Sequence, residues 1–295
     1  MCMSFLSYLI SGITLGSVYA IIALGYTMVY GIAKMLNFAH GDVIMVGAYM
    51  CFFAVSRWNI PPVLGVIIAM AACTVLGIVI ERLAYKPLRS ATSLAVLITA
   101  IGISYFLQNA AQLMWTSNPK VFKSVVGDGS IKLFDGQLAI SVKAIATVAA
   151  CIVIMVALTW FTNKTNMGKA MRASSEDKEA AQLMGININA TISMTFAIGS
   201  ALAAVAGVLL CSTYPTLTPT TGSMPGIKAF TAAVFGGIGS IPGAMLGGVL
   251  LGIIEIFSKA YISTQLSDAI VFAVLIIVLI VKPSGLMGKK TTEKV

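Results

Sequence analysis

Charged side chains are scarce in this 295-residue chain, because Asp, Glu, Lys and Arg together make up only 10% of it. Soluble domains carry about 25% charged and about 45–50% apolar residues, whereas this chain is 58% apolar with a mean hydropathy of +0.96. Most of the chain must therefore lie in lipid. Crossing an apolar layer of about 30 Å takes about 20 residues, so the length allows about eight to ten spans. That leaves no room for a soluble catalytic domain.

Groups that carry chemistry are also few. The chain has one histidine and no nucleophile–base set, paired carboxylates or metal-ligand cluster, so we predict no catalytic residue, metal or cofactor within it. The 19 Lys and Arg residues are scattered and form no dense block that would bind nucleic acid. The cysteines show no CxxC spacing, and four of the five lie in apolar runs as small hydrophobic residues: Cys2, Cys51, Cys73, Cys151 and Cys211.

Long apolar runs recur along the chain without the alternation of strands, so helices are expected. We predict an all-α, polytopic integral membrane protein, with residues 1–295 forming one transmembrane domain of about eight helices. Residues 1–22 carry no charge and lack the features of a cleaved signal peptide, so the first span is expected to be retained. The runs cover residues 5–32, 43–55, 63–80, 94–115, 142–161, 190–211, 227–257 and 269–281.

The run over residues 43–55 is too short for an ordinary crossing. Either its polar flanks extend the helix, or the segment is partly re-entrant. The run over residues 227–257 raises a different problem, since it must begin and end on the outer side if the C-terminal tail is to be cytoplasmic. Its GGIGSIPGA stretch at 236–244 allows a break. We therefore predict a glycine-broken helical hairpin or a re-entrant pair here.

Orientation follows from the preference of Lys and Arg for short cytoplasmic loops. Residues 82–89, the long connection 163–189 and the basic tail are expected in the cytoplasm. The segment 117–141 must then be external, although it holds Lys120, Lys123 and Lys132. Because Asp128 and Asp135 are interleaved with these lysines, we predict a small folded external loop.

The connection 163–189 contains a short helix with recognisable ends. Ser174 or Ser175 is expected to cap its N-terminus, acidic residues follow, and Gly185 suits the left-handed position after its last turn. Such a helix, with small Ala180 and Ala181, is not stable alone and should be covered. A groove of a partner protein is one possibility, and the headgroup layer is the other. The acids weigh against an anionic membrane surface.

Three segments carry a family resemblance. Glu179-Ala180-Ala181, followed after three residues by Gly185, resembles the EAA-x3-G signature of ABC-importer permeases, in which this helix docks into the ATPase. The LNFAHGD stretch at 36–42 and the GGIGSIPGA stretch at 236–244 resemble the branched-chain amino-acid permease family of the LivH type. The predicted ATPase-coupling residues are Glu179, Ala180, Ala181 and Gly185, from this signature, together with Ser174 and Ser175, from the expected helix cap.

The resemblance implies a multi-pass subunit in the plasma membrane of a prokaryote, importing branched-chain or similar amino acids. It also implies a heterodimer with a related permease, two cytoplasmic ATPases that bind ATP and Mg, and an external substrate-binding protein. A permease for a sugar or nucleoside is an alternative, and so is a stand-alone ion-coupled transporter or channel. The last would need a central ionisable group, yet Asp42, Glu81, Glu255 and Asp268 fall near predicted span ends.

Several polar and glycine residues are candidates for the transport pathway or for helix packing. His40, with Asn37, is expected at a span end near water, as a satisfied structural group or a proton relay. Ser104, Gln108 and Gln112 recur every four residues and must face protein or water. Gly236, Gly237, Gly239 and Gly243 permit close packing at a broken helix, where transporters also place pathways.

A last group of charges lies near the outer boundary. Glu255 and Lys259 are spaced as an i, i+4 pair and are expected to anchor a span at the interface. Lys228 and Asp268 are expected to mark outer span ends.

Overall fold

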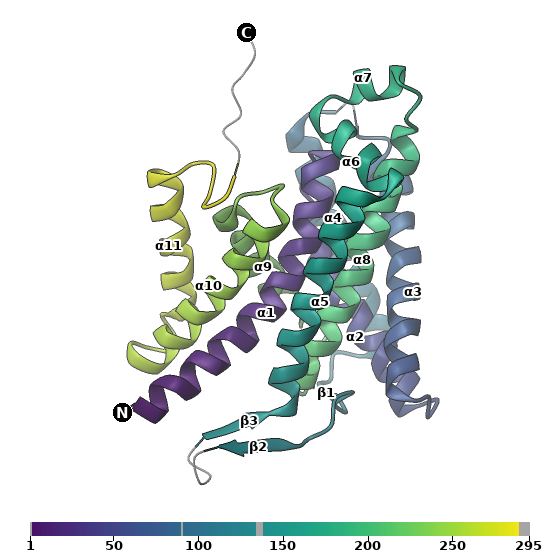
Figure 1. Cartoon of the computed structure of the whole chain (residues 1–295). Coiled ribbons are helices and arrows are strands. Elements are labelled where there is room, and N and C mark those ends of the chain that lie inside the picture. The colour runs from purple at the N-terminus through teal and green to yellow at the C-terminus, as the bar shows by residue number, and fades with distance from the viewer. Residues whose placement is uncertain (1, 90, 134–137, 289–295) are drawn as a thin grey trace.

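The computed structural model describes residues 2–89, 91–133 and 138–288. Nine helices follow the predicted apolar runs, and the run at 227–257 supplies two of them (Figure 1). They are α1 (Cys2–Ala33), α2 (His40–Ser56), α3 (Pro62–Ile80), α4 (Ser93–Trp115), α5 (Val142–Lys164), α8 (Ile188–Thr213), α9 (Ser223–Gly236), α10 (Ile241–Tyr261) and α11 (Ser267–Val281). A π-helical turn, η1 (Glu81–Tyr85), continues α3, and two short helices, α6 (Asn166–Glu176) and α7 (Lys178–Leu183), connect α5 to α8.

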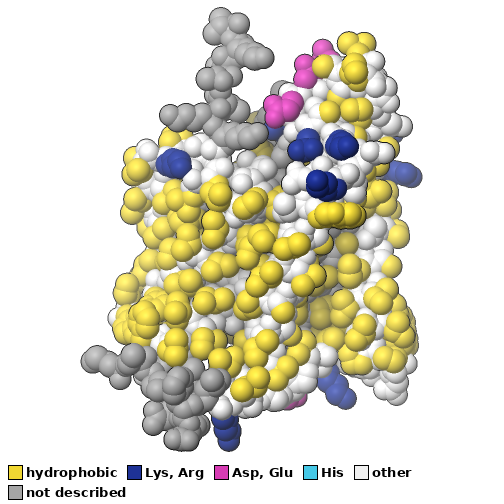
Figure 2. Space-filling model, in the orientation of Figure 1, with side chains coloured by type: hydrophobic (Ala, Val, Ile, Leu, Met, Phe, Trp, Pro, Cys, Tyr) yellow, Lys and Arg dark blue, Asp and Glu magenta, His cyan; other side chains and the backbone are white. Residues whose placement is uncertain are grey.

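Among the described residues, six helices are long and apolar enough to cross a membrane, namely α1, α3 with η1, α4, α5, α8 and α10. Two shorter helices, α2 and α11, are also apolar. Figure 2 shows a broad apolar band with Lys and Arg gathered towards its two ends. The prediction of an all-α, polytopic membrane protein is thereby confirmed. We call the two ends of the bundle the α7 end and the β2–β3 end, as seen in Figure 1.

The largely buried helix α1 runs obliquely through the bundle and packs against α5, α8, α9 and α10 (Figure 1). Its contact with α10 brings the two backbones together at glycines. A Cβ added to Gly16 would lie 2.9 Å from the carbonyl oxygen of Gly248, and one added to Gly248 would lie 2.8 Å from the Ala20 Cβ. Gly252 lies against the backbone of Gly16 in the same way. Small residues are what allow helices to approach this closely in lipid.

Helix α2 begins beside α1 and not beyond its end. Its first residue, His40, contacts Gly25, where an added Cβ would lie 2.6 Å from the imidazole Nε2. Gly25 precedes the last residue of α1, Ala33, by about two turns, so α2 begins about 12 Å short of that helix end. Of the two predictions for residues 43–55, extension by the polar flanks is confirmed, because α2 covers His40–Ser56. Residues 34–39, which we call the re-entrant segment, lead from the end of α1 back into the bundle to the start of α2.

The predicted break in the run 227–257 is confirmed. α9 and α10 form a hairpin whose turn contains Gly237 at φ +105° and Gly239 at φ +93°. Ser240 caps α10, and its hydroxyl oxygen accepts from the Gly243 amide at 3.2 Å. Only α9 is short, since α10 has 21 residues. The glycines after the turn divide between two faces of α10: Gly243 and Gly247 pack on α9, whereas Gly248 and Gly252 pack on α1.

The segment 117–141 contains short strands. β2 (Ser130–Leu133) and β3 (Leu138–Ser141) pair in antiparallel fashion, and β1 (Lys120–Val121) pairs with β4 (Thr216–Leu217), which follows α8. Asp135 lies outside the described residues. The folded character expected of this loop is thus present at the β2–β3 end.

We expect the α1–α10 contact to tolerate no side chain. Gly252→Val should lower the thermal stability of the purified protein in detergent by an overpacking cost of about 1–3 kcal/mol, because the new Cβ meets the α1 backbone. Gly102→Val is the matched control, since Gly102 is also helical but has nothing within 4 Å of its added Cβ. Equal melting temperatures for the two variants would contradict this account of the contact.

Candidate functional site

The connection between α5 and α8 forms two helices where one was predicted. α6 begins after Thr165, and α7 begins after Asp177. The Asp177 carboxylate accepts from the amides of Glu179 at 2.9 Å and Ala180 at 3.0 Å. Asp177 is therefore the N-cap of the helix that carries the Glu-Ala-Ala sequence.

The prediction that Ser174 or Ser175 caps this helix was wrong. Both lie in the last turn of α6, where their hydroxyls donate to the carbonyl oxygens of Ala170 at 2.8 Å and Arg172 at 2.7 Å. Asp177, two residues after Ser175, caps α7, because its carboxylate accepts from two free amides at once. Ser174 is buried and helps to hold α6 against the bundle.

The predicted end of α7 is confirmed. Gly185 adopts φ +82°, and the Ile186 amide donates to the Ala181 carbonyl oxygen at 3.1 Å. Ala181 is buried, whereas Leu183 and Met184 are 88% and 83% exposed. Figure 1 shows α7 at the extreme end of the molecule. Two large apolar side chains are thus uncovered on a six-residue helix that cannot be stable by itself.

One side chain ties α7 directly to the central helix. The Lys178 ammonium donates to the carbonyl oxygen of Ala33, the last residue of α1, at 3.0 Å. A cation is favourable at a helix C-terminus, where carbonyl groups lack amide partners. Burial lowers the pKa of Lys178, and the positive charges of Arg89 and Lys34 lower it further. The position of α7 is thus linked to the end of α1.

A second polar link joins η1 to the start of α8. The Glu81 carboxylate is fully buried, accepts from the Ser193 hydroxyl at 2.6 Å and forms an ion pair with Arg89. Arg89 also donates to Asn189 Oδ1 at 2.5 Å. The sequence placed Glu81 near a span end but indicated none of these partners. Ser193 is 112 positions away, and no local spacing could have revealed the contact.

The N-terminus of α2 brings polar side chains of three helices together, and two of them, Ser104 and Gln108 of α4, are predicted pathway residues. Gln108 donates to Asp42 Oδ1 at 2.9 Å, to Ser223 Oγ at 3.2 Å and to Ser104 Oγ at 3.3 Å. Asp42 is 1% exposed and lies in the first turn of α2, where the helix dipole stabilises a negative charge. Of the predicted stripe, Ser104 and Gln108 join this cluster, whereas Gln112 is exposed.

His40 and Asn37 are buried at the same helix start. The expectation that His40 lies near water was wrong, since it is 1% exposed and its ring packs at a tilt against that of Tyr26, with ring centroids 4.6 Å apart. Its Nε2 has no hydrogen-bond partner among the described residues. Asn37 accepts from the Tyr85 hydroxyl at 3.0 Å, which fixes the re-entrant segment to η1.

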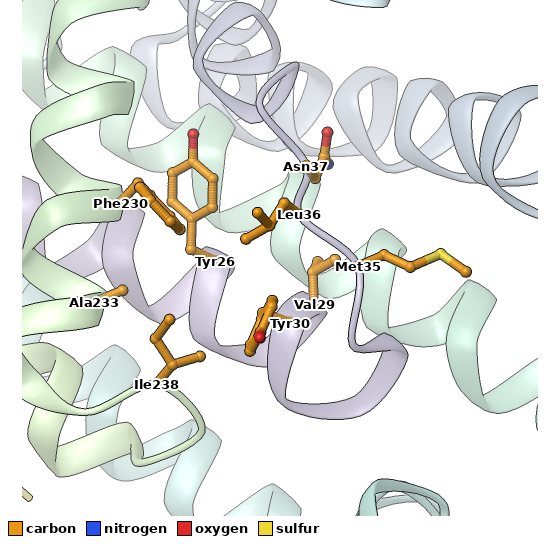
Figure 3. A pocket seen from close by; sticks show the side chains of 9 residues that line it. All are labelled: Tyr26, Val29, Tyr30, Met35, Leu36, Asn37, Phe230, Ala233 and Ile238. Carbon is orange, nitrogen blue, oxygen red and sulfur yellow. The ribbon is translucent and has the colours of Figure 1, made fainter. Parts of the chain in front are cut away.

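A cavity of about 10 Å³ lies between the end of α1, residues 35–37, α9 and the hairpin turn. Figure 3 shows Tyr26, Tyr30 and Phe230 around it, with Ile238 of the turn below. A space of this size holds one water at most. Asn37 lines it, but Gly236, Gly237, Gly239 and Gly243 do not.

The hairpin glycines instead meet other parts of the backbone. An added Cβ at Gly243 would lie 3.1 Å from the Gly236 carbonyl carbon, so the two helices touch at the turn. The chain after α11 returns to the end of α9, where the amides of Leu286 and Met287 donate to the Phe235 and Gly236 carbonyls, both at 2.9 Å. These contacts satisfy carbonyl groups that lipid could not.

A charged network lies at the opposite, β2–β3 end. Glu255 accepts from the Tyr19 hydroxyl at 2.8 Å, from Lys228 at 2.9 Å and from Lys259 at 2.6 Å. Lys228 also pairs with Asp268 at 2.6 Å. The predicted i, i+4 pair is present, but its expected role as an interfacial anchor was wrong for Glu255, which is 1% exposed. Lys228 is likewise buried, so it does not simply mark a span end.

A larger cavity, of about 220 Å³, lies beside this network. Its walls come from α1, α8, the 214–225 segment and α10. Within residues 2–89, 91–133 and 138–288, no three His, Cys, Asp or Glu side chains lie close enough to hold a metal ion.

The apolar helices of the bundle and the basic connection between α5 and α8 define a multi-pass membrane protein. Residues 8–279 match the family model described as "Branched-chain amino acid transport system / permease component", and the chain belongs to that family.

Relatives match along almost the full length. The chain is 46% identical to the high-affinity branched-chain amino acid transport system permease protein LivH of Escherichia coli K12, over 99% of this chain and 98% of that protein. It is 44% identical to the BraD permease protein of Pseudomonas aeruginosa, with the same coverage. Among solved structures, PsaBC from Streptococcus pneumoniae in complex with Fab shares the fold, with a TM-score of 0.50 over 96% of this chain and 97% of that chain at 14% identity.

The Glu81–Arg89 pair gives a test of the link between η1 and α8. Arg89→Met should destabilise the protein by about 3–5 kcal/mol, because it leaves the Glu81 carboxylate buried without its cation. The double variant Glu81→Gln/Arg89→Met should be more stable than Arg89→Met alone, since the uncompensated charge is gone. Unfolding in detergent measures both, and a double variant that is less stable than the single one would contradict the pairing.

Proposed function

We infer that this chain is the permease subunit of an ABC importer for branched-chain amino acids in the inner membrane of a bacterium. The observation that carries this conclusion is the near-complete match to LivH and BraD permeases. The subunit is not an enzyme. ATP and Mg are bound by partner ATPases, and the permease provides the route through the membrane.

The α7 end is the cytoplasmic end in this proposal. Lys164, Lys169 and Arg172 lie on or beside α6 there, and Arg82 and Lys86 lie at the end of α3, as the positive-inside preference requires. The β2–β3 end is then external, with residues 117–141 available to an external substrate-binding protein. Residues 163–189 form the coupling segment towards the ATPases.

The complete importer comprises this chain, a related second permease, two ATPases and the binding protein. Support for an ATPase contact comes from α7. The exposed apolar side chains of Leu183 and Met184 are expected to be buried by a partner. An anionic lipid surface is disfavoured as that partner, because the acids at 176, 177 and 179 would be repelled by it. A protein groove accepts both features. Glu179 and Ala180, both exposed, complete the surface offered to it.

Coupling then follows from the contacts of α7. Closure of the ATPases displaces α7, and Lys178 passes this displacement to the end of α1 at Ala33. The re-entrant segment 34–39 follows α1 directly, and it forms one wall of the small cavity. A shift of α1 there opens or closes the cytoplasmic side. The small cavity there has room for one water at most.

Gly185 provides the test of coupling. Gly185→Leu should impair ATP-driven leucine uptake in proteoliposomes of the complete importer by about tenfold, because a left-handed φ strains a leucine and misplaces the end of α7. Membrane insertion should be unchanged. Gly102→Leu is the matched control, since Gly102 lies in α4 with nothing within 4 Å of its added Cβ. Unchanged uptake by Gly185→Leu would refute the coupling role.

A further inference from the structure

The cavity at the β2–β3 end combines a charged wall with an apolar one. Tyr19, Glu255 and Lys259 form part of its lining, and Leu15, Leu210 and Pro225 form another part. Drug-sized sites occupy about 300–1,000 Å³, so about 220 Å³ suits a smaller solute. A small molecule with a polar head and an aliphatic body would match both walls.

The hydrogen-bonding capacity of the charged wall is only partly used. A carboxylate offers about four acceptor positions, and Glu255 uses three, for Tyr19, Lys228 and Lys259. The Lys259 ammonium has three donors and uses one. One acceptor position on Glu255 and two donors on Lys259 are therefore free for a solute. The free acceptor position is on Oε2, because Oε1 accepts from both lysines and Oε2 accepts from Tyr19 alone. The Lys259 ammonium lies 2.6 Å from Oε1 of the same carboxylate, so the donors and the free acceptor belong to one ion pair.

The overall charge of the network selects the class of solute. Lys228 and Lys259 contribute two positive charges, and Glu255 and Asp268 contribute two negative ones, so the network is neutral. A lone anion or cation would bring an unmatched charge into a partly buried site. A zwitterion brings none, and its two groups can lie antiparallel to the Lys259–Glu255 pair.

We propose that this outer cavity binds the headgroup of a zwitterionic α-amino acid, with its ammonium group at Glu255 and its carboxylate at Lys259. The aliphatic side chain then lies on Leu15, Leu210 and Pro225. The inference rests on the proposed function and adds a solute site within the permease itself, on the external side. The site receives the amino acid before it enters the rest of the pathway.

Equilibrium binding of radiolabelled leucine to the purified complete importer, without the external binding protein, tests this site. Binding should be saturable. Isopentylamine and isocaproate, which each lack one charged group of leucine, should compete at least about tenfold more weakly, because each loses a charge-assisted hydrogen bond. Competition by isocaproate equal to that by leucine would overturn the zwitterion assignment.

Variants locate the binding. Lys259→Met keeps the aliphatic stem and should weaken leucine binding by about tenfold. Lys143→Met is the matched control, because Lys143 also pairs with an acid, Asp128, at 2.6 Å and has a similar side-chain exposure, 25% against 35%. Thr216 is exposed at the cavity, and Thr216→Trp should block binding by filling it without disturbing the charges. Equal leucine affinity of the Lys259→Met and Lys143→Met variants would overturn the proposal.

ATP-driven leucine uptake in proteoliposomes with the external binding protein separates the two conclusions. Uptake by the unmodified importer without saturable leucine binding would overturn the cavity assignment and leave the proposed function standing. Absence of uptake under these conditions would overturn the proposed function.

Discussion

Lipid offers no hydrogen-bond partner to a buried polar group, and this constraint explains where the ionisable residues of the permease lie. Glu81 is paired with Arg89 and Ser193, Glu255 with two lysines and Tyr19, and Asp42 with Gln108. Each of these carboxylates joins helices that are distant in the sequence. The polar groups therefore fix the relative positions of helices that apolar packing alone would leave free to slide.

Helix α1 is the element through which these constraints meet. Its C-terminal carbonyl holds Lys178 of α7, its middle contacts the start of α2 at Gly25, and its N-terminal half packs its glycines on α10. Tyr19 adds the link to Glu255. Helix α1 thus connects α7 with both the re-entrant segment and the outer network. Helices transmit displacements because close-packed interfaces rearrange between discrete states and do not deform continuously.

The helices and the hairpin were predictable from the sequence, because apolar runs and glycines at positive φ act locally. The cap of α7 was predicted at the wrong residue, since Ser and Asp have similar capping preferences and only the fold shows that α6 extends past Ser175. The depth of His40 was also missed. The burial of His40 depends on its contact with Gly25, 15 positions earlier, and on the path of residues 34–39 back into the bundle. No local sequence pattern predicts either feature. The partners of Glu81 and Glu255 could not be predicted either, because Ser193 and Tyr19 lie 112 and 236 positions away in the sequence.

The two cavities differ in a way that bears on the direction of transport. Space for a solute exists beside Glu255 at the β2–β3 end, whereas Tyr26, Tyr30 and Phe230 leave room for one water near the α7 end. Alternating access requires that only one side be open at a time. Glycine contacts hold α1 against α10 near the larger cavity, and Tyr85 holds Asn37 beside the smaller one. Because α1 contributes Tyr26, Val29 and Tyr30 to one cavity and Leu15 and Tyr19 to the other, a change in the tilt of this helix would alter both cavities at once.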